Sequence, residues 1–211
     1  MKNILQTSLF LLTFIIFFSS CVNNKTNKQP ESKTKINKVE DYKLKPGIYD
    51  IDSSISSIEW VGKKPTGSHN GDISLKRGSI QIDSNGSISG GKFIFDMQTI
   101  NCTDLEGKPK ANIEGHLKNE DFFDVEKFPE AFFIIKDVDN SKMSGILTIK
   151  NIPNPISFNY EMTGPLEFKA EIKVDRSLYN IKYASKSFFS DLGDKFIDDI
   201  FTITLNPVKF K

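Results

Sequence analysis

The sequence KFIFDMQ, at residues 92–98, gives the clearest indication of the fold. Phe93, Phe95 and Met97 recur at every second position. The opposite positions are polar: Lys92, Asp96 and Gln98. Because successive side chains of a strand point to opposite faces, this alternation predicts a β-strand with one buried and one solvated face. We therefore expect Phe93 and Phe95 to point inward, and Lys92 and Asp96 to point to solvent.

The same period of two recurs towards the C-terminus, at residues 158–162, 168–174 and 201–205. It predicts that Phe158, Tyr160 and Phe168 also point inward, and that Lys169 and Glu171 point to solvent. Shorter strand candidates are residues 55–62, 72–75, 79–83, 131–138 and 144–150. Turn signals separate the strands at residues 84–86, 139–141, 153–155 and 164–165. Such spacing predicts a mainly β domain, an antiparallel meander closed as a barrel or a sandwich.

One long charged interval, residues 101–129, interrupts this pattern. We expect a helix across about residues 109–118 within it, and a second short helix across residues 184–192.

The charge distribution argues against a nucleic-acid-binding protein. The chain has 211 residues, with 28 basic and 27 acidic side chains. Residues 1–45 hold eight of the basic and three of the acidic ones, so residues 46–211 carry 20 basic and 24 acidic side chains. A nucleic-acid-binding domain would instead show a clustered excess of basic charge.

The N-terminus has the features of an export signal. Lys2 precedes the run LFLLTFIIFF at residues 9–18, and two serines follow it. Ten residues are too few to span a bilayer, so a signal peptide over residues 1–20 is the interpretation. Residues 18–21, FSSC, resemble the lipobox of bacterial lipoproteins, which implies that Cys21 is lipidated. The alternative is that the translation start is wrongly assigned and that these residues form an apolar helix.

Residues 21–45 combine the expected lipidated cysteine with a flexible tether. The segment is rich in Asn and Lys and has no apolar period. Such a composition does not bury enough surface to offset chain entropy. No acidic run follows Cys21. We therefore expect a membrane anchor in the bacterial cell envelope, facing the periplasm and attached to the outer membrane.

Several motifs resemble the YceI-like family. They are GIYDID at residues 47–52, IEW at 58–60, HLKNEDFFD at 116–124, FPEAF at 128–132 and MSGILTI at 143–149. Residues 67–71 and 175–183 are similar to a lipoprotein subgroup of that family. Where the family has Arg-Asp before His-Leu, this chain has Ile113-Glu114-Gly115. A role carried by that arginine does not transfer.

The resemblance implies a lipocalin-like antiparallel barrel of about eight strands over residues 46–211, with one or two short helices. It also implies an isoprenoid or similar amphiphilic lipid in the interior. An eight-stranded barrel has room for one small ligand. The candidate ligand-binding residues are Trp60, His69, Phe93, Phe95, His116, Phe158, Tyr160 and Phe168.

Two questions stay open for these residues. Alternating aromatic side chains suit a filled barrel core as well as a cavity wall. His69 and His116 suit a polar lipid headgroup, but His116 equally suits a hydrogen bond that fixes the insert against the barrel. A carrier of lipid, a structural or interaction module with a solid barrel, and an enzyme acting on a hydrophobic substrate are the three functions considered.

We expect no enzymatic activity, no metal and no cofactor. Two histidines without H-x-H or C-x-x-C spacing do not predict a zinc site. If Cys21 carries lipid, Cys102 has no disulfide partner and is expected to be a small buried residue. The acidic group Asp191, Asp194, Asp198 and Asp199 is interpreted as a solvated loop.

The lipidation hypothesis predicts that Cys21→Ser abolishes membrane association. The variant is expected to leave the detergent-rich fraction in a detergent phase separation, because no acyl chain remains to hold it there. Unchanged partitioning of Cys21→Ser would refute lipidation at this residue.

Overall fold

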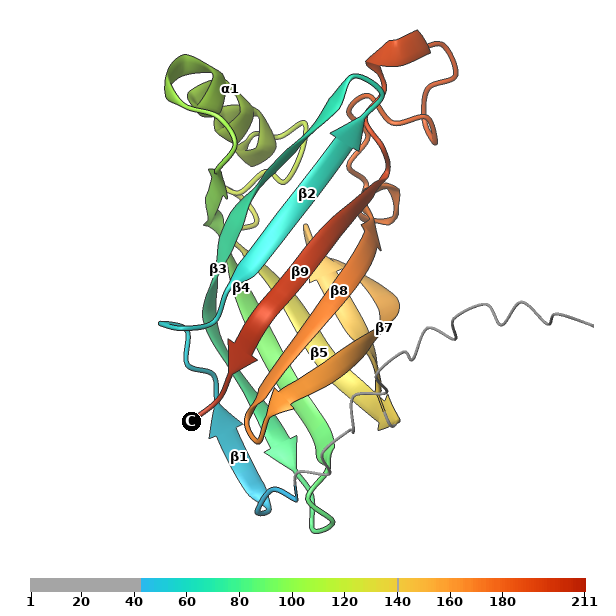
Figure 1. The fold of residues 1–211 in the computed structure, drawn as a ribbon. Coiled ribbons are helices and arrows are strands. Elements are labelled where there is room, and N and C mark those ends of the chain that lie inside the picture. The colour runs from blue at the N-terminus through green and yellow to red at the C-terminus, as the bar shows by residue number, and fades with distance from the viewer. Residues whose placement is uncertain (1–42, 140) are drawn as a thin grey trace, which may run out of the picture. The chain divides into compact units, whose positions relative to one another are not determined.

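The computed structural model describes residues 43–139 and 141–211 (Figure 1). The predicted signal peptide, Cys21 and all but the last three residues of the predicted tether lie outside the described residues. The described residues belong to one compact unit. Within the described residues, no helix is both long and apolar enough to cross a bilayer.

Nine strands, one α-helix and two short 3₁₀ helices make up the described residues (Figure 1). The strands are β1 (Gly47–Asp50), β2 (Ile58–Lys64), β3 (Gly67–Ile82), β4 (Ile88–Cys102), β5 (Glu130–Asp139), β6 (Lys142–Ile149), β7 (Ile152–Gly164), β8 (Glu167–Asp175) and β9 (Ile200–Lys209). The helices are α1 (Gly107–Lys118), η1 (Arg176–Tyr179) and η2 (Gly193–Lys195).

The strands form a single antiparallel sheet that closes on itself. Their order is β1-β3-β2-β9-β8-β7-β6-β5-β4, and an additional pairing of β3 with β4 completes the ring. Eight strands belong to the ring, because β1 pairs only with the end of β3 that β2 leaves uncovered. The predicted antiparallel barrel of about eight strands is confirmed.

The alternation seen in the sequence sets the inner and outer faces. Phe93, Phe158 and Phe168 are buried, and Phe95 and Tyr160 are half-buried members of the same interior cluster. The side chains of the outer face are solvent-exposed at Lys92, Lys169 and Glu171, and half-buried at Asp96.

Two strand boundaries differ from the prediction. Residues 72–75 and 79–83 belong to one continuous strand, β3, whose irregularities are register shifts against β4 rather than a turn. Pro153 and Pro155 lie inside β7, not in a turn. The chain reverses at Lys150 and Asn151 instead, and both residues have positive φ angles of 52° and 59°. Two consecutive residues with positive φ are typical of a two-residue hairpin turn. The turn therefore lies just before the Pro-Asn-Pro segment predicted to form it.

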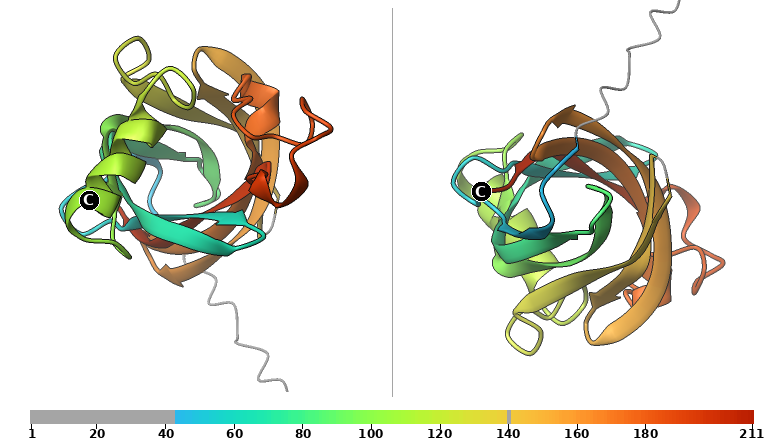
Figure 2. Two further views of the ribbon diagram at one scale, coloured as in Figure 1. Left: turned by 90° about the horizontal axis from the view of Figure 1, so that it is seen from above. Right: turned by 90° about the horizontal axis from the view of Figure 1, so that it is seen from below.

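The first expected helix is confirmed, and the second is wrong. Helix α1 lies across the rim of the barrel (Figures 1 and 2), and none of its residues is buried. Residues 184–192 form turns and irregular backbone instead, and Ala184 at their start has a positive φ angle of 48°, which does not fit an α-helix. The turns belong to the segment between β8 and β9, drawn in orange to red at the same end of the barrel (Figure 1).

The interior has two apolar clusters. The first closes the end where β1 lies; it includes Ile51, Ile82, Ile88, Phe93, Phe133, Phe158, Phe168 and Phe210. The second lies towards α1; it includes Met97, Ile100, Phe122, Val125, Ile149, Val174, Tyr179 and Ile181. Helix α1 lies at one side of the rim (Figure 2) and contributes no buried side chain, so this end of the barrel is less completely filled.

Candidate functional site

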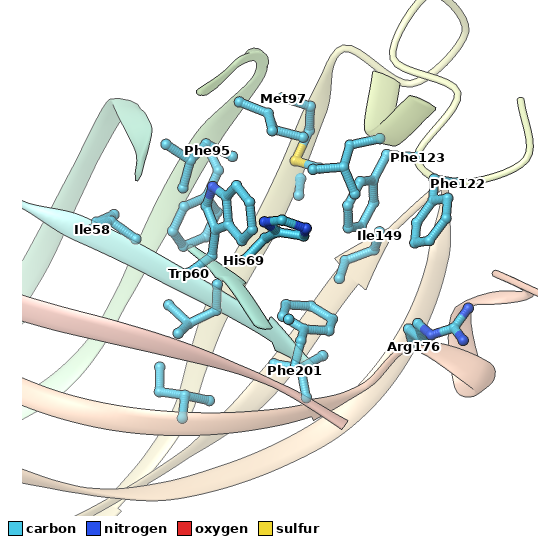
Figure 3. A pocket seen from close by; sticks show the side chains of 18 of the residues that line it. Ile58, Trp60, His69, Phe95, Met97, Phe122, Phe123, Ile149, Arg176 and Phe201 are labelled. Atoms are coloured by element: carbon cyan, nitrogen blue, oxygen red, sulfur yellow. The ribbon is translucent and has the colours of Figure 1, made fainter. Parts of the chain in front are cut away.

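A cavity of about 660 Å³ occupies the barrel interior. Its size falls within the range of about 300–1,000 Å³ that is common for small-molecule sites. The wall is mainly aliphatic and aromatic, with side chains from every strand of the ring. Trp60, Phe95 and His69 lie on one side, and Phe122, Phe123 and Arg176 lie on another (Figure 3).

Seven of the eight predicted ligand-binding residues line this cavity. They are Trp60, His69, Phe93, Phe95, His116, Phe158 and Phe168. Tyr160 is not among the lining residues. Its ring packs edge-on against Phe168, with the ring centroids 5.8 Å apart, and burial raises the pKa of its hydroxyl. Tyr160 is therefore part of the packed core, whereas Phe168 packs against Tyr160 and also lines the cavity.

Trp60 presents an apolar surface to the cavity because its polar atom is satisfied elsewhere. The indole Nε1 donates a hydrogen bond of 3.1 Å to the carbonyl oxygen of Asp72. The ring lies against Gly71 in β3, where an added Cβ would come within 2.6 Å of it. Glycine at this position allows the indole to lie flat against the wall.

His69 is oriented by a carboxylate outside the cavity wall. Its Nδ1 lies 2.9 Å from Oδ2 of Asp104. Burial opposes ionisation of Asp104, but hydrogen bonds from the Asn70 backbone, His69 and Cys102 outweigh it and lower the pKa of Asp104 to about 2. Because the ionised carboxylate only accepts hydrogen bonds, Nδ1 of His69 carries the proton. In the neutral form of the ring, Nε2 is then the nitrogen that accepts a hydrogen bond.

Among the described residues, His69, Cys102 and Asp104 form a group that could hold a metal ion. Their candidate ligand atoms lie within 4.8 Å of one another. Each atom already takes part in a hydrogen bond, since the Cys102 thiol donates to Asp104 over 3.1 Å. Burial and this hydrogen bond raise the pKa of the Cys102 thiol, which favours its protonated form. The arrangement accounts for the position of His69 without a metal.

His116 brings an unpartnered polar atom to the cavity. Its Nδ1 lies 3.5 Å from the side-chain amide nitrogen of Asn119. Its Nε2 is buried and has no hydrogen-bond partner among the described residues. The ring packs edge-on against Phe122 and Tyr183, at centroid distances of 4.9 and 4.3 Å. A buried, unsatisfied nitrogen costs about 1–3 kcal/mol, which a ligand atom could recover.

Helix α1 is held in place by the side chains of Glu114 and Lys110. Glu114 accepts a hydrogen bond of 2.8 Å from the backbone nitrogen of Cys102, and this bond lowers the pKa of Glu114. Lys110 donates to the side chain of Asn101 over 2.7 Å. These bonds join α1 to the end of β4 and so fix His116 over the cavity.

Arg176 is the main site residue that sequence reasoning missed. It is 3% exposed and lines the cavity, yet its guanidinium is fully engaged. It donates to the carbonyl oxygens of Ile181, Tyr183, Ile197 and Asp198. Because these acceptors span the segment between β8 and β9, Arg176 holds that segment onto the barrel. A single arginine after a strand gives no signal of such a role.

Asp199 is the partner of Arg176, not part of a solvated loop. Its Oδ1 lies 3.2 Å from Nη2 of Arg176, and its Oδ2 accepts a hydrogen bond of 2.7 Å from the Ser187 hydroxyl. Burial would raise the pKa of Asp199, but hydrogen bonds from Ser185 and Ser187 and the charge of Arg176 lower it. The solvated-loop prediction holds for Asp191 and Asp194, which are exposed.

The polar groups gather at one end of an otherwise apolar cavity. His69, His116, Asn112, Lys63, Lys64 and Asp198 line it together with the apolar residues. Lys63 and Lys64 are exposed at the end of β2, whereas the opposite end is closed by phenylalanines. The arrangement suits a molecule with a long apolar part and a small polar end.

A family model for the YceI-like domain matches residues 49–208. The chain belongs to the YceI-like domain family. A UPF0312 protein of Staphylococcus aureus (strain USA300) is 43% identical over 66 residues, which cover 31% of this chain and 38% of that protein. A UPF0312 protein of Photorhabdus laumondii is 27% identical over 143 residues, 57% of this chain and 70% of that protein.

Two solved structures share the fold of this YceI-like protein. Burkholderia cenocepacia BcnA matches with a TM-score of 0.54 and 19% identity, over 75% of this chain and 98% of that one. A polyisoprenoid-binding domain from Saccharophagus degradans, implicated in plant cell wall breakdown, matches with a TM-score of 0.51 and 11% identity, over 77% and 98%.

The lowered pKa of Asp104 predicts a specific acid dependence of stability. The carboxylate stabilises the folded state above its ordinary pKa of 3.8, and this contribution is lost as the pH falls towards about 2. Asp104→Asn should therefore lower the free energy of unfolding by a constant amount above about pH 5, and by less as the pH decreases below about 4.

Urea denaturation across this pH range measures the difference. Asp50→Asn, at an exposed carboxylate in β1, controls for the general loss of one negative charge. A difference between wild type and Asp104→Asn that stays constant down to about pH 2 would contradict the role given to the Asp104 hydrogen bonds.

Proposed function

We propose that this protein binds an isoprenoid or similar amphiphilic lipid and carries it in the bacterial cell envelope. The observation that carries the proposal is the apolar cavity of about 660 Å³ with polar side chains gathered at one end. The proposal assigns a binding role rather than a catalytic one. A solid structural barrel is the weaker alternative, because its interior would be filled.

The energetics favour a long apolar ligand. Burial of about 400 Å² of apolar surface contributes roughly 10 kcal/mol at about 25 cal/mol per Å². Lost translational and conformational freedom offsets a large part of this. Micromolar or tighter binding therefore requires no ionic anchor. The similarity in fold to the Saccharophagus degradans polyisoprenoid-binding domain supports an isoprenoid chain as the apolar part.

The polar end of the ligand is proposed to lie between His69 and His116. Asp104 holds a proton on Nδ1 of His69, so that Nε2 of the neutral ring is the acceptor that the proposal uses. The Nε2 atom of His116 lacks a partner and is available to donate. A small uncharged group such as a hydroxyl satisfies both positions. Arg176 is already engaged, so it is not proposed as the counter-ion of an anionic ligand.

The proposed location is the periplasmic face of the outer membrane, to which a lipid on Cys21 would anchor the chain. The FSSC stretch at residues 18–21 supports this proposal, together with the export signal ahead of it. A carrier for a poorly soluble lipid benefits from an anchor, because the anchor keeps the barrel close to the bilayer that contains such lipids.

Gly62 offers a clean test of ligand binding. It lines the cavity, and a Cβ added to it meets no atom within 4 Å. Gly62→Phe should therefore place a ring in the ligand's volume with little loss in the free energy of unfolding, because the space that the ring enters is already open. Trp60 is the single tryptophan of the chain and lines the same cavity, so its fluorescence reports on occupancy.

Addition of geranylgeraniol should change the Trp60 emission of the wild-type protein in a saturable way. Gly62→Ala should preserve that response, whereas Gly62→Phe should weaken the apparent affinity by about tenfold or more. If wild type gives no saturable response, or if Gly62→Phe responds like wild type, lipid binding in this cavity is refuted.

A further inference from the structure

The large apolar side chains that remain exposed are concentrated at one end of the barrel. Seven are found among the described residues, and five of them fall between η1 and the start of β9: Leu178, Tyr183, Phe188, Phe189 and Ile200. The other two, Ile48 and Ile55, precede β2. Exposed apolar clusters of this kind mark surfaces that contact a membrane or another macromolecule.

Phe188 and Phe189 are adjacent in the middle of this segment. They are 41% and 49% exposed, and the backbone nitrogen of each donates to the carbonyl oxygen of Ser185. Ser185 is itself completely buried, so the turn that carries the two rings is held by the protein. Figures 1 and 2 show the segment projecting beyond the barrel at the end where α1 lies.

Tyr183 connects these residues to the mouth of the cavity. It is 45% exposed, yet its ring centroid lies 4.3 Å from that of His116 and 5.7 Å from that of Phe122. His116 and Phe122 both line the cavity. Tyr183 therefore places one exposed aromatic side chain of this segment beside two residues that line the cavity.

The charges around the aromatic pair are close to balanced. Lys182, Lys186 and Lys195 are exposed, and so are Asp191 and Asp194. Lys182 and Lys186 place their ammonium groups over the rings of Phe188 and Phe196, at 5.3 and 3.4 Å from the centroids. Lysines in this arrangement can stay at the headgroup level while an aromatic ring enters the interface.

We propose that Tyr183, Phe188 and Phe189 form a docking surface for a phospholipid bilayer, through which the ligand enters and leaves. The inference rests on the proposed function, since an apolar chain crosses directly from bilayer to cavity only if the mouth touches the bilayer. Because the charges are nearly balanced, we expect the aromatic side chains to insert into the bilayer and binding to depend little on anionic lipid.

The proposed anchor at Cys21 is compatible with this docking. The barrel's first described residues lie at the end opposite the docking surface (Figure 1). The 22 residues from Cys21 to Tyr42 span at most about 75 Å when fully extended. The 16 residues of β3 span about 54 Å. The tether is therefore longer than the barrel, and both ends of the molecule can reach one membrane.

The test uses residues 22–211, which lack the anchor and retain the compact unit from Val39 to Lys211. Wild type should sediment with vesicles of phosphatidylcholine alone, and added phosphatidylglycerol or salt should change this little. The double variant Phe188→Ser/Phe189→Ser should bind these vesicles at least about tenfold more weakly. The matched control Ile48→Ser/Ile55→Ser removes two exposed apolar side chains elsewhere and should stay within about twofold of wild type.

The geranylgeraniol response of Trp60, measured without vesicles, separates the two proposals. Phe188→Ser/Phe189→Ser should retain it while losing vesicle binding and slowing lipid transfer from vesicles. Docking is overturned if wild type does not sediment with either vesicle, or if the two double variants lose binding equally. A wild-type protein that binds vesicles without any Trp60 response would refute the proposed function instead.

Discussion

The pairing of β3 with β4 closes the sheet into a barrel. Without it, the sheet would keep two open edges and its apolar face would meet water. The two strands have 16 and 15 residues, and three register shifts between them increase the local twist and bend that closure requires. Closure turns the alternation of apolar and polar residues into an interior wall. Phenylalanines fill one end of the interior, whereas α1 lies beside the other end and contributes no buried side chain. This asymmetry leaves the cavity.

The buried polar groups at the mouth divide into two kinds. Arg176 donates hydrogen bonds to four carbonyl oxygens and lies beside Asp199. Its guanidinium therefore holds the segment between β8 and β9 in place. His116 is fixed by α1 but leaves Nε2 without a partner among the described residues. The first kind stabilises the frame, because removal of one member of a buried ion pair typically costs about 3–5 kcal/mol. The second kind leaves hydrogen-bonding capacity for a ligand.

The barrel could be predicted from the sequence because period-two alternation depends only on which face of a strand is buried. Seven of the eight candidate ligand-binding residues line the cavity. Tyr160 has the same period but packs against Phe168, since periodicity gives the face and not the depth along the strand. The role of Arg176 depends on carbonyl groups up to 22 residues away, which no local pattern reveals. The sequence predicts two short strands where the structure has β3, because β3 stays paired with β4 through its irregularities. The function of Asp104 depends on a partner 35 residues earlier in the chain.

Native mass spectrometry of the protein released from bacterial membranes would show directly whether the barrel carries a lipid. Wild type is expected to carry a non-covalent lipid of isoprenoid mass, and Gly62→Phe, with its ring in the same cavity, is expected to carry much less. Any lipid on Cys21 adds an equal covalent mass to both proteins and does not confuse the comparison. A wild-type protein whose mass matches that of the chain and its covalent anchor alone, under conditions that preserve the fold, would contradict a lipid-carrying barrel.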